Sequence, residues 1–137
     1  MIDMTITQDK KTGETEKIWR QAILPKSSTI KQAISNLNQV GIRIVLVLDK
    51  ANKLLGTISD GDIRRGLLKG LDLNDAIDKL INRNALVVPP EMARDMVMQL
   101  MAANKVQQIP VVDGQQQLVG LHLWDEMSSV PARVNLM

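Results

Sequence analysis

Cysteine, tyrosine and phenylalanine are absent from this 137-residue chain, which has one histidine and two tryptophans. Without cysteine there is no disulfide, thiol nucleophile or cysteine metal site, and a reducing compartment is compatible with the chain. A single histidine excludes a metal cluster built on several histidines of one chain. The core must therefore consist of aliphatic side chains and methionine, and the eight methionines indicate adaptable packing or partner surfaces.

The sequence also lacks a strong charge excess and a long apolar run. A formal net charge of +2 is too small to argue for a nucleic-acid partner. No apolar run approaches the roughly 20 residues that span a bilayer. The polar N-terminus contains no apolar signal core. We therefore expect no nucleic-acid partner, no membrane partner and a cytoplasmic location.

A helix and two strands follow a polar start. Residues 1–17 have no sustained period and are predicted to be a flexible arm. An extended piece ends at Pro25, and Thr29 with Gln32 forms the capping box of a helix that ends near Gly41. The apolar patterns then predict the following elements: strands at 44–48 and 54–59, a helix at 63–69, and a short helix at 74–80 capped by Asn74.

The same order begins again in the second half of the chain. Extended residues 85–88, a helix at 93–101, strands at 108–112 and 118–123 and a short helix to Met127 are predicted. At a spacing of 64 residues Pro25 falls on Pro89, Asp49 on Asp113, and the Leu54-Leu55-Gly56 segment on Leu118-Val119-Gly120, while the helix recurs one residue out of step. Three landmarks at one spacing indicate an internal repeat.

Each half has the order strand–helix–strand–strand–helix, and neither half has enough apolar surface to be stable alone. We therefore predict an α/β (α+β) fold in which two β-α-β-β-α motifs, 18–81 and 82–130, pack sheet to sheet around a pseudo-two-fold axis.

The stretch from Gly56 to Arg65 is the most informative part of the chain. A strand enters it, a helix leaves it from Asp62, and a hydroxyl and two carboxylates lie between them. Free N–H groups at a helix N-terminus favour an anion such as phosphate. Asp60 and Asp62 flank a glycine, but two carboxylates on one turn are weak evidence for Mg²⁺, and no metal site is predicted.

These residues, with Val45-Leu46-Val47-Leu48-Asp49 and Ile109-Pro110-Val111-Val112-Asp113, resemble a tandem pair of CBS (cystathionine β-synthase) domains, the Bateman module. The resemblance covers residues 20–130. The segment Ser59-Asp60-Gly61-Asp62-Ile63-Arg64-Arg65 is similar to the CBS pairs of arabinose-phosphate isomerases and sugar-1-phosphate nucleotidyltransferases. Residues 120–126 look like the nucleotidyltransferase branch (mannose-1-phosphate guanylyltransferase-like), which implies that 131–137 begin a linker to a nucleotidyltransferase domain.

The resemblance implies a nucleotide in the cleft between the halves. It gives Ser59 to phosphate and Asp62 to the ribose hydroxyls, while Arg64 and Arg65 add charge for a polyphosphate and Asp60 lies beside them. The predicted walls of the cleft are Leu24, Arg43, Ile44, Leu86, Val87, Gln107 and Gln108. Each residue also has a purely structural alternative. Asp62 could only cap a helix, the two arginines could form a solvated helix face, and the predicted wall residues could belong to the hydrophobic core or the rim.

The second half departs from the family pattern. Leu123 stands at the position of Ser59 and cannot hydrogen-bond phosphate, and Glu126 stands at the position of Asp62 unless a one-residue slip places Asp125 there. We therefore expect one competent site and a degenerate second one at His122, Leu123, Asp125 and Glu126. His122 is more typical of a structural histidine, and Trp124 either stacks on a base or seals a contact.

Three functions compete. The first is a regulatory sensor of AMP, ADP or ATP that controls an attached sugar-phosphate nucleotidyltransferase. The second is a structural module without a ligand, because CBS pairs commonly form homodimers through their helices. The third, a free-standing enzyme, ranks last because the sequence shows no Walker loop or nucleophile–base pair, so no catalytic residue and no catalytic cofactor are predicted. Cytidine or guanosine nucleotides and S-adenosylmethionine remain open as ligands.

Overall fold

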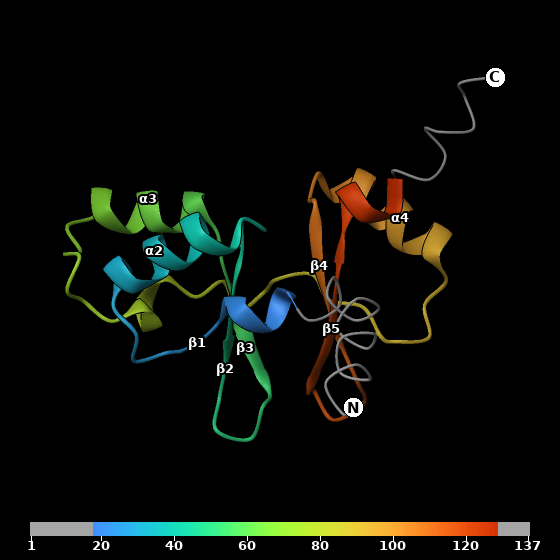
Figure 1. Cartoon of the computed structure of the whole chain (residues 1–137), viewed down its shortest axis with the longest axis horizontal. Coiled ribbons are helices and arrows are strands. Elements are labelled where there is room, and N and C mark those ends of the chain that lie inside the picture. Colours follow the sequence, from blue (N-terminus) through green and yellow to red (C-terminus); the bar gives the residue numbers. More distant parts are fainter. Residues whose placement is uncertain (1–17, 129–137) are drawn as a thin grey trace, which may run out of the picture.

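The computed structural model describes residues 18–128. The first half contains η1 (Trp19–Ala22), β1 (Ile23–Pro25), α2 (Ile30–Val40), β2 (Val45–Leu48), β3 (Leu54–Ile58), α3 (Asp60–Leu68) and η2 (Ile77–Leu80). The second half contains α4 (Arg94–Asn104), β4 (Gln108–Val112), β5 (Leu118–Leu123) and a helical segment at 124–128 (Figure 1). The predicted arm at 1–17 and linker at 131–137 lie outside the described residues.

Local signals fix the ends of the first helices. Thr29 caps α2 by accepting a hydrogen bond from Gln32 N at 3.1 Å, and the Gln32 side chain accepts from Thr29 N at 2.8 Å, as predicted. Gly41 ends the helix in the left-handed region, at φ 80°. The start predicted for α3 was wrong, because Ser59 is its N-cap and the helix begins at Asp60.

The helix predicted at 74–80 is only partly present. A single 3-10 turn covers Ile77–Leu80, and Ala76 before it is extended rather than helical. The preceding backbone is committed to α2 instead, because Asp75 O accepts from Ile30 N at 2.9 Å and Leu73 O accepts from Lys31 N at 3.0 Å. These bonds satisfy two of the free N–H groups at the start of α2, which explains why tertiary contact prevails over helix propensity here.

The two sheets repeat each other in register. In the first sheet β1 is parallel to β2 and β2 is antiparallel to β3, and in the second β4 is antiparallel to β5. Val45 pairs with Ile58 just as Ile109 pairs with His122, and both hairpins shift register near the end of the first strand. A parallel bridge between Val88 and Val111 stands where β1 meets β2 in the first half.

The two main helices recur in the same register. The bounds of α2 and α4 are related by the same 64-residue spacing as the strands, so the predicted one-residue offset was wrong. Buried Ala33 and Leu37 correspond to buried Val97 and Met101. The offset arose from taking Ala93 as the first apolar helical position, whereas Ala93 is the N-cap of α4.

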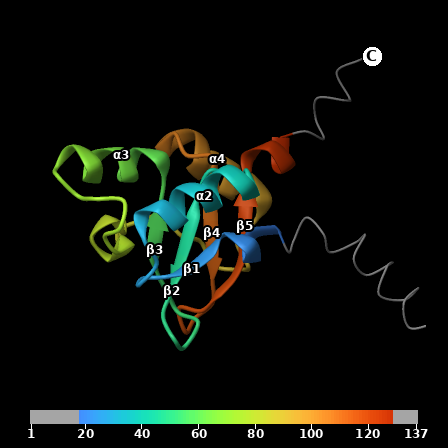
Figure 2. The ribbon, with the colours of Figure 1, turned by 60° about the vertical axis from the view of Figure 1, so that its left-hand side comes forward.

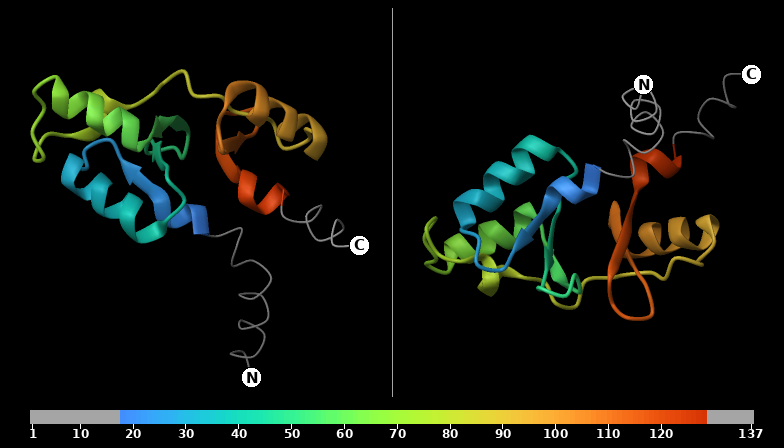
Figure 3. Two further views of the ribbon diagram at one scale, coloured as in Figure 1. Left: turned by 90° about the horizontal axis from the view of Figure 1, so that it is seen from above. Right: turned by 60° about the horizontal axis from the view of Figure 1, so that its bottom comes forward.

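The sheets face each other and the helices lie outside, with α2 and α3 on one side and α4 on the other (Figures 1 and 3). Three apolar clusters fill the layers. The first lies between the first sheet and α2 and α3, and the second lies between the second sheet and α4. The third joins the sheets and contains Trp19, Ala22, Ile42, Ile44 and Leu46, with Leu54, Leu118, Leu121 and Leu123 packed against it.

Hydrogen bonds between equivalent residues of the two halves reveal the pseudo-two-fold axis. Leu54 N donates to Gln116 O at 3.0 Å, and its repeat partner Leu118 N donates to Asn52 O at 3.3 Å. Lys53 and Gln117, also repeat partners, form an antiparallel bridge. The tips of the two hairpins therefore lie side by side (Figures 1 and 2). The predicted sheet-to-sheet α+β fold is confirmed.

Candidate functional site

One cavity lies between the halves where β3 ends and α3 begins. Its volume is about 210 Å³. Four segments meet there: the β3–α3 junction, the residue just before β2, the segment that joins the halves, and β4 with Val106, two residues before it. Its lining residues are Ile44, Thr57, Ser59, Asp62, Arg65, Asn82, Ala85, Leu86, Val106, Gln108 and Pro110.

Close approach of two backbones forms one edge of this cavity. Thr57 in β3 bridges to Asn82, with Asn82 N donating to Thr57 O at 2.8 Å and Thr57 N donating to Asn82 O at 3.2 Å. The neighbouring Gly56 permits this contact, because a Cβ there would lie 2.4 Å from Asn82 O. The segment that joins the halves is thereby held against the mouth of the cavity.

The polar end of the cavity is the N-terminus of α3. The Ser59 hydroxyl accepts from Asp62 N at 3.3 Å, and Asp62 Oδ2 accepts from Ser59 N at 2.9 Å and from Ser59 Oγ at 3.0 Å. This is a reciprocal capping box, so the capping role that competes with ligand binding for Asp62 is present. The first helical N–H groups have no acceptor within the helix, which leaves a positive backbone end beside the cavity.

The second carboxylate oxygen of Asp62 is held by Arg65. Arg65 Nη2 donates to Asp62 Oδ1 at 2.7 Å, and the side chains of Arg65 and Asp62 are 64% and 16% exposed, respectively. Arg64 and Asp60 are exposed on the same helix and do not line the cavity. The structure therefore distinguishes Arg65 from Arg64, which the sequence did not.

Six of the residues predicted for the ligand site lie together in this cavity. Their contact with a ligand stays a prediction. They are Ser59, Asp62, Arg65, Ile44, Leu86 and Gln108.

The other predicted residues lie elsewhere. Leu24 packs against the first core cluster, so its side chain belongs to the core of the first half and not to the cavity between the halves. Val87 does not line the cavity and lies between the lining residue Leu86 and the buried Val88. Arg43 and Gln107 line a smaller neighbouring cavity.

Five lining residues were missed from the sequence. Thr57 had a usable signal, since it precedes Ser59 by two residues and strand side chains alternate, which places both on one face. The others lacked a comparable signal, because only the packing of the halves brings them to the cavity. They are Asn82, Ala85, Val106 and Pro110.

Apolar side chains occupy the pseudo-symmetric counterpart of this cavity. Leu121 and Leu123 stand where Thr57 and Ser59 stand in the first half, and both pack against the cluster between the sheets. Ala22 stands at the repeat position of Leu86 and is fully buried there. Trp19 of η1, 5% exposed, belongs to the same cluster. The two repeats thus build one open cavity and one apolar core at equivalent places.

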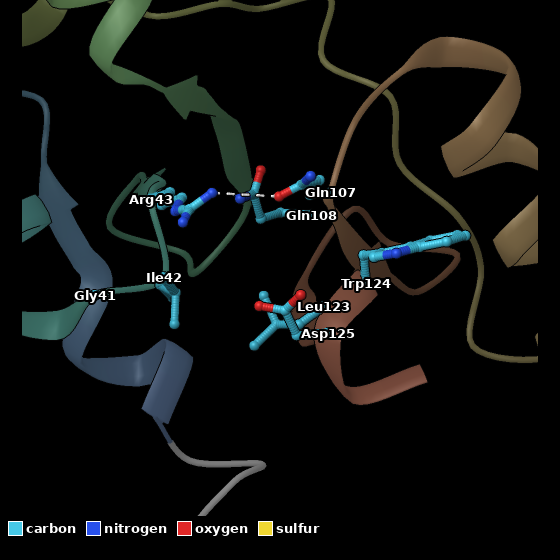
Figure 4. A pocket seen from close by; sticks show the side chains of 8 residues that line it. All are labelled: Gly41, Ile42, Arg43, Gln107, Gln108, Leu123, Trp124 and Asp125. Atoms are coloured by element: carbon cyan, nitrogen blue, oxygen red, sulfur yellow. Dashed lines mark hydrogen bonds between the residues drawn. The ribbon is translucent and has the colours of Figure 1, made fainter. Parts of the chain in front are cut away.

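A cavity of about 70 Å³ remains beside this core, near the pseudo-two-fold axis. Figure 4 shows Arg43 and Gln107 directed toward each other across it, with Arg43 Nη1 donating to Gln107 Oε1 at 3.5 Å. Leu123 and Asp125 line it from the second half. Gln108 lines both this cavity and the larger one, so the two are neighbours.

Burial shifts the pKa of two groups predicted for the second site. Desolvation lowers the pKa of His122 below its ordinary 6.5 and raises the pKa of Glu126 above 4.5. His122 stands at the repeat position of the fully buried Ile58, which fits the structural interpretation of this histidine. Trp124 packs against the second core cluster, and its indole ring points away from Arg43 (Figure 4).

A larger groove of about 640 Å³ lies at the far end of the first sheet, between residues 25–27 and 48–51. The Asp49 carboxylate faces its own turn there and accepts from Ala51 N at 2.8 Å and Lys53 N at 2.9 Å. Asp113 makes the same turn in the second half. Because this carboxylate serves the hairpin, the groove is the weaker candidate despite its size.

Between residues 18 and 128, no three His, Cys, Asp or Glu side chains gather as a metal ion would require. Over the same residues, no helix has the length and apolar character to cross a membrane. The chemistry of the described site therefore rests on the hydroxyls, the carboxylate, the guanidinium and the helix N-terminus around the cavity.

Residues 19–69 and 73–121 each match the profile of the CBS domain. The chain belongs to the CBS domain family. Its two halves are a tandem CBS pair, as the repeat predicted. Among curated relatives, the arabinose 5-phosphate isomerase KdsD of Pseudomonas aeruginosa is 30% identical over 94 residues, which are 68% of this chain and 29% of that protein. The chain thus spans less than a third of the curated relatives it matches.

Solved CBS pairs share the fold. The pair of protein MJ0100, solved with 5′-methylthioadenosine and S-adenosyl-L-methionine, superposes with a TM-score of 0.71 at 22% identity, covering 82% of this chain and 88% of that one. CBSX2, solved with AMP, has a TM-score of 0.70 at 19% identity over the same shares. At these identities the likeness establishes the architecture of the CBS pair.

Proposed function

We propose that this CBS pair is a regulatory nucleotide-binding module whose ligand is an adenine nucleotide. The observation that carries the proposal is the cavity between the halves, where Ser59, Asp62 and Arg65 meet the apolar Ile44 and Leu86. Apolar walls with a few convergent polar groups are typical of small-molecule sites. Solved relatives with AMP or S-adenosyl-L-methionine support the choice of an adenine compound.

Each polar group has a defined role in this proposal. The Asp62 carboxylate accepts the ribose hydroxyls, and Ser59 with the start of α3 receives phosphate. The cavity of 210 Å³ lies below the roughly 300–1,000 Å³ that is usual for small-molecule sites. The nucleotide therefore occupies it only in part and leaves its charged end beside the exposed Arg65.

The module regulates an attached enzyme in this proposal. The arabinose 5-phosphate isomerase relatives support a sugar-phosphate enzyme as that partner. Residues 120–126 carry the resemblance to the nucleotidyltransferase branch, so we propose that the attached enzyme is a sugar-1-phosphate nucleotidyltransferase in the cytoplasm, joined through the linker predicted to begin at 131–137. In this proposal the ligand binds one relative orientation of motifs 18–81 and 82–130 more tightly than another. Binding therefore shifts the population toward that orientation, which alters the attached enzyme.

A second candidate function is a dimerisation module without a ligand. Exposed apolar side chains on and beside the outer helices favour it, with Leu68 81% and Met96 55% exposed. Ile34, Leu67 and Leu73 are also exposed. Contiguous exposed apolar patches mark protein contacts, and Leu67, Leu68 and Leu73 lie within one short stretch of the chain. A homodimer through these helices is compatible with nucleotide binding as well.

Calorimetric titration with AMP, ATP and GTP tests the proposed function. We expect saturable binding of an adenine nucleotide, and a loss of affinity of about tenfold or more in Asp62→Ala, because two ribose hydrogen bonds to a charged acceptor disappear. Sedimentation or light scattering on the same samples measures the oligomeric state.

Gln32→Ala is the matched control for Asp62→Ala. Both substitutions remove the N3 residue of a capping box, but Gln32 lies on α2 away from the cavity. Gln32→Ala should destabilise the fold similarly and leave nucleotide affinity unchanged. Equal affinity loss in both variants would refute the ligand role of Asp62, and a stable dimer that binds no nucleotide would favour the dimerisation module.

A further inference from the structure

Arg64 and Arg65 are adjacent in the sequence but have different surroundings. Arg64 is exposed and does not line the cavity. Arg65 lies one helical turn after Asp62, and its guanidinium folds back over the first turn of α3 to reach the carboxylate at 2.7 Å. Arg65 itself belongs to the last turn of α3, and only its guanidinium reaches the first turn, where the positive end of the helix dipole is otherwise unfavourable for a cation. Arg65 is therefore held at the cavity by Asp62.

Gly61 provides the room for this arrangement. A Cβ at Gly61 would lie 3.2 Å from Nη1 and 3.6 Å from Nη2 of Arg65, which is tighter than an ordinary contact for the first atom. The guanidinium thus lies over the bare backbone of Gly61. Within this segment Ser59 caps the helix, Gly61 leaves room, and Arg65 reaches back to the Asp62 carboxylate.

The Asp62 carboxylate accepts three hydrogen bonds in this state. Oδ2 accepts from Ser59 N and Oγ, and Oδ1 accepts from Arg65. A carboxylate offers about four acceptor positions, so a ribose diol that needs two of them competes with the bonds already present. We expect the bond between Arg65 and Asp62 to break first. The Arg65 side chain is largely exposed, which makes this bond weak, whereas the bonds between Ser59 and Asp62 cap the helix.

We propose that Arg65 is the residue by which the site distinguishes a nucleoside phosphate from a nucleoside. On binding, its guanidinium exchanges the Asp62 carboxylate for phosphate oxygens, and Asp62 turns to the ribose. Once released from Asp62, the Arg65 guanidinium lies near the N-terminus of α3. The guanidinium and the backbone N–H groups of that helix end then donate to the same phosphate. This inference rests on the proposed nucleotide-binding function and specifies which cation of the site carries phosphate recognition.

The test compares adenosine with AMP and ATP in calorimetric titrations of the intact chain. In Arg65→Gln the affinity for the nucleotide should fall by about tenfold, as for one charge-assisted hydrogen-bond pair at a partly exposed site. The affinity for adenosine should stay the same or rise, because Asp62 is freed from its ion pair. Added salt should reduce the difference in affinity between nucleotide and adenosine more in the unaltered chain than in Arg65→Gln, where only the helix N-terminus still attracts the phosphate.

Two further variants sharpen the result. Arg64→Gln removes the same charge one residue away and should change either affinity by less than about twofold. Gly61→Ala, which crowds the guanidinium, should lower nucleotide affinity in the direction of Arg65→Gln while retaining the charge. Helicity by circular dichroism should be the same in all variants.

The outcomes separate this inference from the proposed function. If Arg65→Gln weakens adenosine and nucleotide equally, or if Arg64→Gln matches it, Arg65 does not read phosphate although the chain still binds nucleotides. If the unaltered chain binds neither adenosine nor a nucleotide, the proposed function fails and this inference fails with it.

Discussion

At the residue scale, Gly56 and Gly120 show how one repeat position acquires different constraints. They occupy equivalent places in β3 and β5, opposite Val47 and Val111. Gly56 meets the segment that joins the halves, whereas a Cβ at Gly120 would lie 3.6 Å from the Val111 side chain, an ordinary contact. The glycine requirement therefore comes from the chain crossing at Asn82 and not from the hairpin.

Gly56→Ala should destabilise the protein much more than Gly120→Ala. The new Cβ would lie 2.4 Å from Asn82 O and 2.5 Å from Ile81 Cγ2, and overpacking of this kind costs about 1–3 kcal/mol. Gly120→Ala should stay within about 0.5 kcal/mol, as surface and ordinary-contact changes do. Urea unfolding of both variants measures the difference, and equal effects would contradict the close approach described here.

At the element scale, α2 and α4 begin and end at equivalent positions of the repeat, but their N-termini are capped differently. Thr29 caps α2 with its side chain, and the backbone of Leu73 and Asp75 accepts from the next two N–H groups. Ala93, the N-cap of α4, has no side-chain hydrogen bond although its backbone is extended, at φ −65° and ψ 147°. The first turn of α4 is therefore less well satisfied than that of α2.

Ala93→Ser should stabilise the protein by about 0.5–1 kcal/mol, because a serine in this backbone conformation can accept from the first turn of α4. Thr29→Ala, the reciprocal change on α2, should destabilise it by about 1 kcal/mol. Both effects are measured as changes in the denaturant midpoint at constant slope. No gain in Ala93→Ser would indicate that the α4 N-terminus is already satisfied in solution.

At the scale of the whole molecule, the fold has pseudo-two-fold symmetry, but its two equivalent clefts differ. The strand registers, the hairpin turns and the bonds at the hairpin tips all obey the repeat. The clefts differ because Trp19 and Ala22 fill one of them, while the equivalent segment in the other, which contains Asn82 and Leu86, only lines it. One cleft thus contributes to the core that joins the halves, and the other stays open.

Trp19→Ala should remove a large share of the stability of the pair. Replacing a buried tryptophan by alanine costs about 3–5 kcal/mol, against a total of about 5–15 kcal/mol for an ordinary domain. Arg20→Ala is the control, since the exposed Arg20 has its guanidinium 4.7 Å from the Trp19 ring centroid and should contribute less than about 1 kcal/mol. Thermal and urea unfolding measure both. A small effect of Trp19→Ala would mean that the sheets are joined chiefly elsewhere.

The sequence by itself determined the local elements, the repeat and the position of the polar strand–helix junction. Interactions between residues that are close in the chain can be predicted from the sequence alone. Examples are the capping box at Thr29, the left-handed helix end at Gly41 and the hairpin turns at Asp49 and Asp113. The 64-residue spacing then predicted how the halves face each other.

Only the tertiary structure decided which side chains meet. It placed Asn82, Val106 and Pro110 at the cavity and packed Leu24 against the first core cluster. It also placed Arg65, but not Arg64, at the cavity. The physical reason is that these positions depend on contacts between segments far apart in the chain. The same residue at equivalent positions of the repeat can have different constraints, as Gly56 and Gly120 show, because a distant segment packs against one of them and not against the other.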